Sequence, residues 1–382
     1  GAERKRNKMK ITNVEAIVLK QPGEILMIGD GSQDTVLIKV DTDEGITGWG
    51  ECDSSPYVVK TIVDCPASHV VCRGLKDILM GQDPFDVEKI WNDMYRGSYY
   101  YGRRSVGIHA MSGIDIALWD IMGKAVGKPV HKLLGGKVNN RLRAYASMLM
   151  PDTEEEVRNK AKEYMAKGFT AIKFGWGALG ESREKDIRLV KAAREAMGEE
   201  ADLMLDIGYL WKNSKYAEMM CKELESFHPY WIEEPIISDD VQGFSKLTQK
   251  TTLNIASGEE LTGLYEFREL IERGGVDIVQ PDMSRCGGLT IAKKIADMAL
   301  LNGIEICPHA FKSGILMAAS IQLLAAYRGT PLLEYCSQET VLSKGLLKNH
   351  FELQPDGMVE VLDLPGLGIE IDEAAVEKYR IS

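Results

Sequence analysis

Long apolar runs are absent from this sequence of 382 residues, and no stretch reaches the length that a membrane-spanning helix requires. Cysteine is sparse: the seven cysteines are an odd number and show no CxxC or zinc-type spacing. This pattern argues against a disulfide framework and indicates reduced thiols, so we expect a cytoplasmic protein. The basic start, residues 1–8, lacks the apolar segment of a secretory signal and is expected to be a tail or an expression remnant.

An excess of positive charge is also lacking. Lysine and arginine number 46 against 57 aspartates and glutamates, which gives a formal net charge of -11. This balance argues against nucleic acid as a partner, because nucleic acid binding depends on clustered basic residues. An acidic small-molecule substrate is compatible with it, since a bound cation reverses the local field of an acidic site. The length favours two domains.

The first part of the chain, residues 9–140, combines strands and helices and is expected to form an α+β domain. Alternating apolar residues predict strands over 10–20 and 34–51, the second divided by the turn sequence TDEG. Apolar residues at three- and four-residue steps predict helices between residues 68 and 126. Gly127, followed by a lysine and a proline, predicts the end of the last of these helices.

From residue 141 to 343, short β-branched runs alternate with longer amphipathic segments. The eight runs are LRAYASM, FTAIKFG, DLMLDIG, YWIEEP, LNIASGEE, DIVQPD, IEICPH and PLLEYC. Strand alternating with helix indicates parallel pairing through right-handed crossovers. The sequence therefore predicts a (β/α)₈-type, TIM-like barrel. The tail, residues 344–382, is expected to return to the N-terminal region, so that both together form the capping domain.

Seven of these runs end with a polar residue: Lys173, Asp206, Glu233, Glu259, Asp282, His309 and Glu334. Successive members lie 23 to 33 residues apart, about one strand and one helix. Because active sites of such barrels lie at the carboxyl ends of the strands, we expect one ring of polar groups around one mouth. Each of these residues, taken alone, could have a purely structural role. A structural interpretation must, however, account for all seven positions at once.

The carboxylates of this ring would repel one another, and a divalent cation removes that repulsion. Asp206, Glu233 and Glu259 are consecutive in the series and provide the oxygen ligands that Mg²⁺ prefers. The sequence does not decide which member of the doublets Glu233–Glu234 and Glu259–Glu260 would bind the cation, because Glu234 and Glu260 are adjacent alternatives. Neighbouring residues of a strand point to opposite faces, so only one of each doublet faces inward.

The other members of the ring suit acid–base chemistry. Lys173 and His309 lie on either side of the carboxylate set in the series, and each can act as a base if its pKa is close to neutral. Asp282 is placed one strand before His309, where it can accept the ring proton and fix the tautomer. Glu334, if protonated, can donate a hydrogen bond to a developing oxyanion.

These motifs make the chain resemble the mandelate racemase subgroup of the enolase superfamily. The resemblance covers the chain from about Met9 and is carried by IKFG, MLDIG, WIEEP, ASGEEL, IVQPDMSRCGGLT, ICPHAF and LLEY, with GIDIALWDIMGKAVGKPVHKLLGG before the barrel and LPGLGIEID after it. It implies removal of a proton α to a carboxylate, with Mg²⁺ stabilising the enediolate. It also implies that the segments QPGEILMIGDGSQD and CDSSPYVV cover the barrel mouth.

The resemblance gives a role to each polar residue at a strand end: Mg²⁺ binding by Asp206, Glu233 and Glu259, an Asp282–His309 dyad, a base at Lys173, and Glu334 near the substrate carboxylate. One departure is visible. Many members carry Lys-x-Lys on the second strand, whereas this chain has Ala171-Ile172-Lys173, so that the first lysine is missing. We expect Trp176 to line the site instead, and Tyr57 and Arg285 to contact the substrate.

Two reactions are compatible with these residues. In a dehydratase, one base removes the C2 proton and His309 helps to expel the C3 hydroxyl; in a racemase, Lys173 and His309 act on opposite faces of one carbon. We expect a Mg²⁺-dependent hydro-lyase that converts an aldonate or aldarate to a 2-keto-3-deoxy acid. Polar residues near the expected mouth favour a hydroxylated substrate: Ser54, Ser55, Tyr57, Arg103 and Arg104. A barrel that binds metal without catalysis is the remaining alternative. We also expect a homo-oligomer without nucleic acid or membrane partners.

Overall fold

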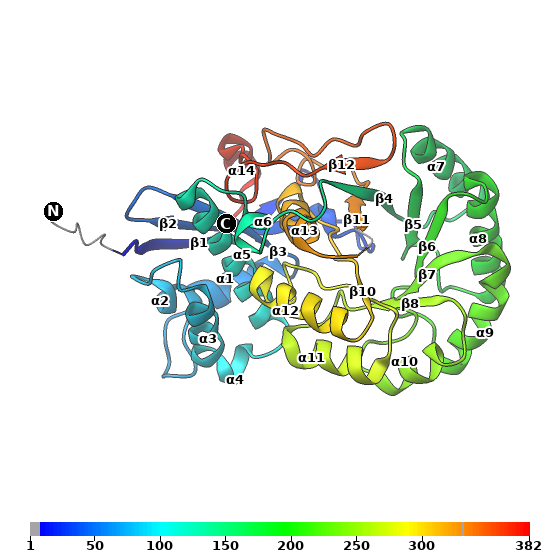
Figure 1. Cartoon of the computed structure of the whole chain (residues 1–382), viewed down its shortest axis with the longest axis horizontal. Coiled ribbons are helices and arrows are strands. Elements are labelled where there is room, and N and C mark those ends of the chain that lie inside the picture. Colours follow the sequence, from blue (N-terminus) through cyan, green and yellow to red (C-terminus); the bar gives the residue numbers. More distant parts are fainter. Residues whose placement is uncertain (1–7, 330–331) are drawn as a thin grey trace.

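The computed structural model describes residues 8–329 and 332–382 and shows a capping domain beside a barrel (Figure 1). The capping domain contains an antiparallel sheet of order β1-β2-β3, made of β1 (Ile11–Lys20), β2 (Asp34–Thr42) and β3 (Thr47–Cys52). Its helices are α1 (Pro56–Asp64), α2 (Leu75–Leu79), α3 (Val87–Gly97), α4 (Tyr99–Gly102), α5 (Val106–Val126) and α6 (Val130–Leu133). These bounds confirm the predicted strands and the predicted helical region.

Helix α5 packs directly on β3 because two glycines of that strand leave room for it. A Cβ atom at Gly50 would lie 1.9 Å from the carbonyl oxygen of Gly113, and one at Gly48 would lie 2.1 Å from that of Ala117. The helix ends at Gly127, whose φ of 63° is the left-handed conformation expected of a glycine at that position.

The eight predicted strands all form and run parallel. They are β4 (Arg141–Leu149), β5 (Ala171–Gly175), β6 (Asp202–Asp206), β7 (Pro229–Glu233), β8 (Asn254–Ser257), β9 (Ile278–Val279), β10 (Glu305–Ile306) and β11 (Leu332–Cys336). Pairing runs in chain order from β4 to β10, and β11 pairs with β4, which curls the sheet into a barrel. Cys307, just after β10, places its Sγ 3.5 Å from the carbonyl oxygen of Leu332, so the two ends of the sheet meet.

The helices between the strands surround the barrel (Figure 1). They are α7 (Glu154–Ala166), α8 (Arg183–Met197), α9 (Ser214–Leu224), α10 (Val241–Thr248), α11 (Gly263–Glu269), α12 (Gly288–Leu301) and α13 (Gly314–Ala326). Short helical segments are η1 (Gly31–Gln33), η2 (Glu225–Phe227) and η3 (Leu270–Gly274). The local sequence determines where several of these helices begin. At the start of α7, for example, Thr153 and Glu156 cap each other's backbone N–H groups.

One apolar layer closes the inside of the barrel. Each of the eight strands or its extension contributes one buried side chain to it: Tyr145, Ala171, Met204, Trp231, Ala256, Ile278, Cys307 and Leu332. The barrel is therefore a packed core and not a pore, and this layer forms the floor on which the next inward-facing residues stand.

The C-terminal tail differs in part from the expectation. Strand β12 (Met358–Glu360) pairs antiparallel with barrel strand β4, not with the capping sheet. Other parts of the tail return to the capping domain as expected. Leu367 N–H donates to Asp120 Oδ1 of α5 at 3.0 Å, and after α14 (Glu373–Tyr379) Ile381 N–H donates to the carbonyl oxygen of Val18. The tail thus fastens both regions together.

Two sequence-based expectations concern absences. Throughout residues 8–329 and 332–382, no helix combines the length and apolarity needed to cross a membrane. All seven cysteines lie in this part of the chain, and all are free thiols.

Candidate active site

The candidate site is the layer of side chains two residues above the apolar floor. Side chains alternate along a strand, so adding two to each floor position gives the next inward-facing residue. Seven of the eight positions carry a buried polar side chain: Ser147, Lys173, Asp206, Glu233, Gln280, His309 and Glu334. The eighth is Gly258, which adds no side chain. Because β8 and β9 are short, Glu259 and Asp282 approach from just beyond the strand ends.

Three of the predicted carboxylates converge. One oxygen from each of Asp206, Glu233 and Glu259 lies within 4.8 Å of the others, and all three side chains are buried. Burial, together with repulsion from Glu233, raises the pKa of Asp206 well above its ordinary value. Burial raises the pKa of Glu259 to about 8. These carboxyl groups lack sufficient positive charge from the protein, which is the condition that a divalent cation relieves.

The geometry distinguishes the members of each doublet. Glu234 turns away from the three carboxylates and accepts hydrogen bonds from Ser257 Oγ (2.9 Å) and the N–H of Gly258 (2.8 Å). Its φ of 42° is rare for a glutamate and coincides with the end of β7. Glu260 accepts a hydrogen bond from Ser238 Oγ at 2.7 Å, and it does not line the central cavity. Glu233 and Glu259 are therefore the inward-facing members.

Lys173 stands beside the carboxylates as their main cation. Its Nζ lies 2.7 Å from Glu233 Oε1 and 3.0 Å from Glu334 Oε1, and the side chain is buried. Burial opposes its charge, but these carboxylates outweigh that effect and raise its pKa well above the ordinary value. Lys173 is thus held as an ammonium ion. A base at this position requires that positive charge bound to the carboxylates lower its pKa again.

The structure shows what lies below and above Lys173 on the inward face of β5. Ala171 belongs to the apolar floor between Tyr145 and Met204. The inward position that lines the cavity above Lys173 is Gly175, where a Cβ would lie 2.6 Å from Asp206 Cβ. Neither inward neighbour of Lys173 therefore carries a second lysine, because residues 171, 173 and 175 share the inward face.

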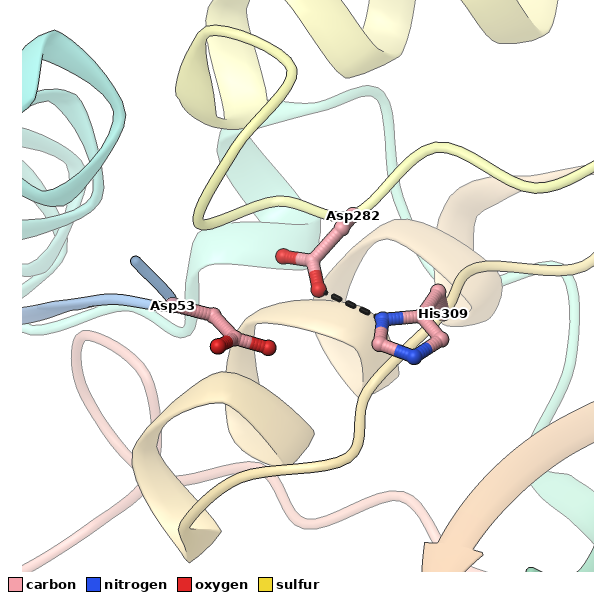
Figure 2. A group of neighbouring side chains, drawn as sticks. All are labelled: Asp53, Asp282 and His309. Carbon is pink, nitrogen blue, oxygen red and sulfur yellow. Dashed lines mark hydrogen bonds and ion pairs between the residues drawn. The ribbon is translucent and has the colours of Figure 1, made fainter. Parts of the chain in front are cut away.

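His309 is joined to Asp282 as the sequence predicts. Its Nδ1 lies 2.7 Å from Asp282 Oδ2, which leaves Nε2 on the opposite side of the ring (Figure 2). Nε2 is 3.3 Å from Glu259 Oε2, an electrostatic contact without the alignment of a hydrogen bond. Burial opposes the charge of the imidazole, but Glu259, Glu334 and Asp282 together raise its pKa to about 10. His309 is therefore set up to hold a proton at the cavity.

Glu334 does not fit the protonated role considered from the sequence. It accepts hydrogen bonds from Ser147 Oγ (2.7 Å) and the N–H of Ala310 (2.6 Å), and it pairs with Lys173. Burial opposes its ionisation, but Lys173 and His309 outweigh burial and lower its pKa to about 2. The structure therefore corrects that expectation: Glu334 is an ionised acceptor that orients its neighbours.

A cavity of about 280 Å³ opens above these groups. Trp176 lines it, as expected, with the left-handed φ of 51°. Glycines on either side make room for the indole, since a Cβ at Gly29 would lie 3.2 Å from it and one at Gly208 would lie 2.9 Å from it. Arg285 lines the cavity too.

Tyr57 does not reach this cavity. It is the second residue of α1, and its side chain is 58% exposed. Of the two arginines considered with it, Arg104 pairs with Glu266 at 3.5 Å, outside the cavity lining. These contacts were expected from polarity alone, which does not tell which way a side chain points.

The capping domain contributes a carboxylate that the sequence did not reveal. Asp53 lines the cavity, and one of its oxygens lies within 4.8 Å of ligand atoms of both Asp282 and His309 (Figure 2). Arg285 Nη2 pairs with it at 2.8 Å and Lys312 Nζ at 3.3 Å, so these cations hold it as an ion. The resemblance places the segment CDSSPYVV over the mouth but does not single out Asp53 within it, because its partners Arg285 and Lys312 lie more than 230 residues away in the sequence.

Two further residues escaped the sequence reasoning. Ser284 links the domains to the dyad: its Oγ accepts from the N–H of Asp53 (3.1 Å) and donates to Asp282 Oδ1 (2.5 Å). Gln280 belongs to the inward layer, and neither polar atom of its amide has a hydrogen-bond partner among the described residues. The alternation of inward and outward side chains along a strand would have revealed Gln280, because it lies two residues before Asp282 on the same face.

Comparison with known proteins finds family models that match both parts of the chain. The family model described as mandelate racemase / muconate lactonizing enzyme, N-terminal domain, matches residues 8–135, and that described as enolase C-terminal domain-like matches 156–375. The D-galactonate dehydratase of Ralstonia pickettii is 35% identical over 89% of this chain and 90% of its own. The D-galactarolactone cycloisomerase of Agrobacterium fabrum is 32% identical over 98% and 99%. Among solved structures, the 3,6-anhydro-D-galactonate cycloisomerase of Zobellia galactanivorans superposes with a TM-score of 0.88 at 32% identity, over 98% of this chain and 100% of that one.

Proposed function

Because this chain belongs to the enolase superfamily, and within it to the mandelate racemase / muconate lactonizing enzyme family, we propose that it is a Mg²⁺-dependent hydro-lyase acting on a sugar acid. The relatives named as D-galactonate dehydratases support the substrate class and the reaction. The product is a 2-keto-3-deoxy acid.

The observation that carries this proposal is the His309–Asp282 dyad. The hydrogen bond to Asp282 fixes Nδ1 as the protonated nitrogen and leaves Nε2 to exchange a proton with a substrate. The side chain lines the cavity together with Lys173, Asp206 and Glu259. A purely structural histidine would have no need of a cavity at its free nitrogen.

The reaction then balances without any oxidant or reductant. His309 must begin neutral at Nε2, which requires that positive charge at the neighbouring carboxylates lower its raised pKa. The C2–H bond of the substrate then breaks, and its proton goes to Nε2 of His309. The C3–O bond breaks next, and the imidazolium returns a proton to the leaving hydroxyl, which departs as water. The remaining enol loses its O–H proton to solvent, takes up a proton at C3 and becomes the keto acid.

The residues fit a divalent cation at Asp206, Glu233 and Glu259, whose oxygens converge; the protein leaves the charges of Asp206 and Glu259 poorly compensated. When bound there, Mg²⁺ would stabilise the negative charge that develops on the substrate carboxylate. Lys173 supplies a second positive charge in the same polar layer, and Glu334 keeps that ammonium group in place. Asp282 stabilises the imidazolium of His309 while it carries the proton.

Lys173 is the second candidate for the base. If it acted as a base together with His309, the protein would be a racemase, which is the alternative function. Transfer of a proton between the faces of one carbon needs two bases. Lys173 is engaged by two carboxylates, whereas the inward position above it is Gly175. This arrangement favours one acid–base group, His309, and therefore favours elimination over racemisation.

The test is a screen of aldonic and aldaric acids with Mg²⁺, in which the keto acid is detected by semicarbazide absorbance. We expect turnover of at least one acid. Exchange of the C2 hydrogen with solvent deuterium, without keto acid from any substrate, would favour the racemase. Mg²⁺ binding without turnover or exchange would favour a barrel that binds metal but does not catalyse.

A further inference from the structure

We infer that the preferred substrate is a monocarboxylate, an aldonate whose far end carries a hydroxyl group, and that aldarates with a second carboxylate are disfavoured. This inference rests on the proposed function and concerns the part of the cavity that faces the capping domain. The inference narrows the substrate class, which the acid–base groups at the bottom of the cavity leave open.

The first step is the orientation of the substrate. The reacting carboxylate is attracted to the polar layer above the apolar floor, where Lys173 and the candidate cation site lie. The rest of the substrate must therefore extend toward the capping domain, which closes the cavity with Ile28, Gly29, Asp30, Gly31 and Asp53. A cavity of about 280 Å³ leaves little room for the substrate to turn around.

The second step is the charge of that side of the cavity. Its two ionisable residues, Asp30 and Asp53, are both acidic. Asp30 accepts hydrogen bonds from the N–H and Oγ of Ser32, at 2.8 and 2.6 Å, through one oxygen. No lysine, arginine or histidine of the described chain lies within 4.0 Å of its carboxylate. Its other oxygen is available to accept from a substrate hydroxyl.

The third step is that the nearby cations are already paired. Arg285 donates to both the backbone oxygen and the carboxylate of Asp53, at 3.0 and 2.8 Å, and to the backbone oxygen of Glu259 at 3.0 Å. Lys312 is buried between Asp53 and the carbonyl oxygen of Gly31. Each nitrogen of Arg285 and the ammonium group of Lys312 already serve acceptors of the protein, so a second substrate carboxylate would have to compete with Asp53 for them.

The rest of the wall is apolar and strengthens the same preference. Trp176, Ile28 and Phe311 line the cavity with Met148 and Leu149. These side chains suit the C–H faces of a carbon chain, but they would strip water from a carboxylate without giving it a partner. Like charges brought together at a binding site repel each other, and a tenfold to hundredfold preference corresponds to about 1.4–2.8 kcal/mol. Discrimination of about tenfold to a hundredfold against the diacid follows.

The experiment compares kcat/KM for aldonates and aldarates of matched stereochemistry, so that each pair differs only at the terminal carbon. We expect the wild-type protein to favour the aldonate by at least about tenfold. Asp30→Asn should narrow that ratio by about tenfold, mainly by raising turnover of the aldarate. Asp53→Asn should narrow the ratio as well, together with a loss for both substrates because Asp53 lies beside the His309–Asp282 dyad. Asp34→Asn is the matched control: Asp34 is also on the capping domain and lies 3.8 Å from Lys312 Nζ, but outside the cavity lining, so the ratio should not change.

The outcomes separate this inference from the proposed function. A wild-type preference for the aldarate would overturn the inference and leave dehydration standing. A uniform loss of both activities in Asp30→Asn and Asp53→Asn, with the ratio unchanged, would also overturn it, because damage to the fold lowers both substrates together. The absence of keto acid from every aldonate and aldarate tested would overturn the proposed function, and the inference with it.

Discussion

Replacing His309 with asparagine separates a catalytic from a structural role. The imidazole is buried between Asp282 and Glu259, at 2.7 and 3.3 Å, so its loss removes one charge-assisted hydrogen bond and one favourable charge contact. A hydrogen bond to a charged group contributes about 1.5–3 kcal/mol. We therefore expect His309→Asn to lower the free energy of unfolding by about 2–3 kcal/mol in saturating Mg²⁺, where the cation still compensates Glu259.

The effect on catalysis should be larger and of a different kind. Loss of a general acid–base group lowers turnover by on the order of 10² to 10⁴. At 1.36 kcal/mol per factor of ten, this corresponds to about 2.7–5.5 kcal/mol of activation free energy. Mg²⁺ affinity, measured by calorimetry, should stay close to wild type because the three carboxylates remain. Exchange of the C2 hydrogen should disappear together with elimination if His309 removes that proton.

His131→Asn is the matched control. His131 is fully buried and its Nε2 lies 3.1 Å from Asp363 Oδ1, but it is not part of the cavity lining. Urea denaturation and keto acid formation are measured for both variants. If His309→Asn loses stability but keeps turnover within tenfold of wild type, as His131→Asn should, the catalytic role is wrong. If His309→Asn still exchanges the C2 hydrogen without eliminating water, Lys173 is the base.

Four further predictions concern the metal, the doublet, one buried carboxyl group and assembly. Chelation should abolish turnover and Mg²⁺ should restore it; activity that persists in excess chelator would contradict the metal site. Glu233→Gln should weaken Mg²⁺ binding measured by calorimetry, whereas Glu234→Gln should not, because Glu234 faces Ser257; the reverse result would exchange their roles. Burial raises the pKa of Asp115 to about 7, so its ionisation destabilises the fold as pH rises from about 4 through 7, at most by about 1.4 kcal/mol per pH unit. Asp115→Asn should therefore flatten the loss of unfolding free energy over that range, and an unchanged pH profile would contradict this. Sedimentation velocity should show a homo-oligomer, and a species of 42.4 kDa would contradict it.

The amino-acid sequence by itself determined the barrel and most of the polar ring. Periodicity is a local property, so eight short apolar runs separated by amphipathic helices were sufficient to predict parallel strands. Their regular spacing placed Lys173, Asp206 and His309 on one mouth, since all strands of such a barrel end at the same face. The same alternation would have added Gln280 and shown that Ala171 lies in the floor.

Only the tertiary structure decided which member of each doublet faces inward and what surrounds it. Glu233 and Glu234 are equivalent in composition, and the φ of 42° that turns Glu234 toward Ser257 depends on how neighbouring strands end. Asp53 reaches His309 only because the two domains pack together through Ser284 and Arg285, more than 230 residues away. Contacts of that kind depend on the relative position of whole domains, which local patterns of polarity do not encode.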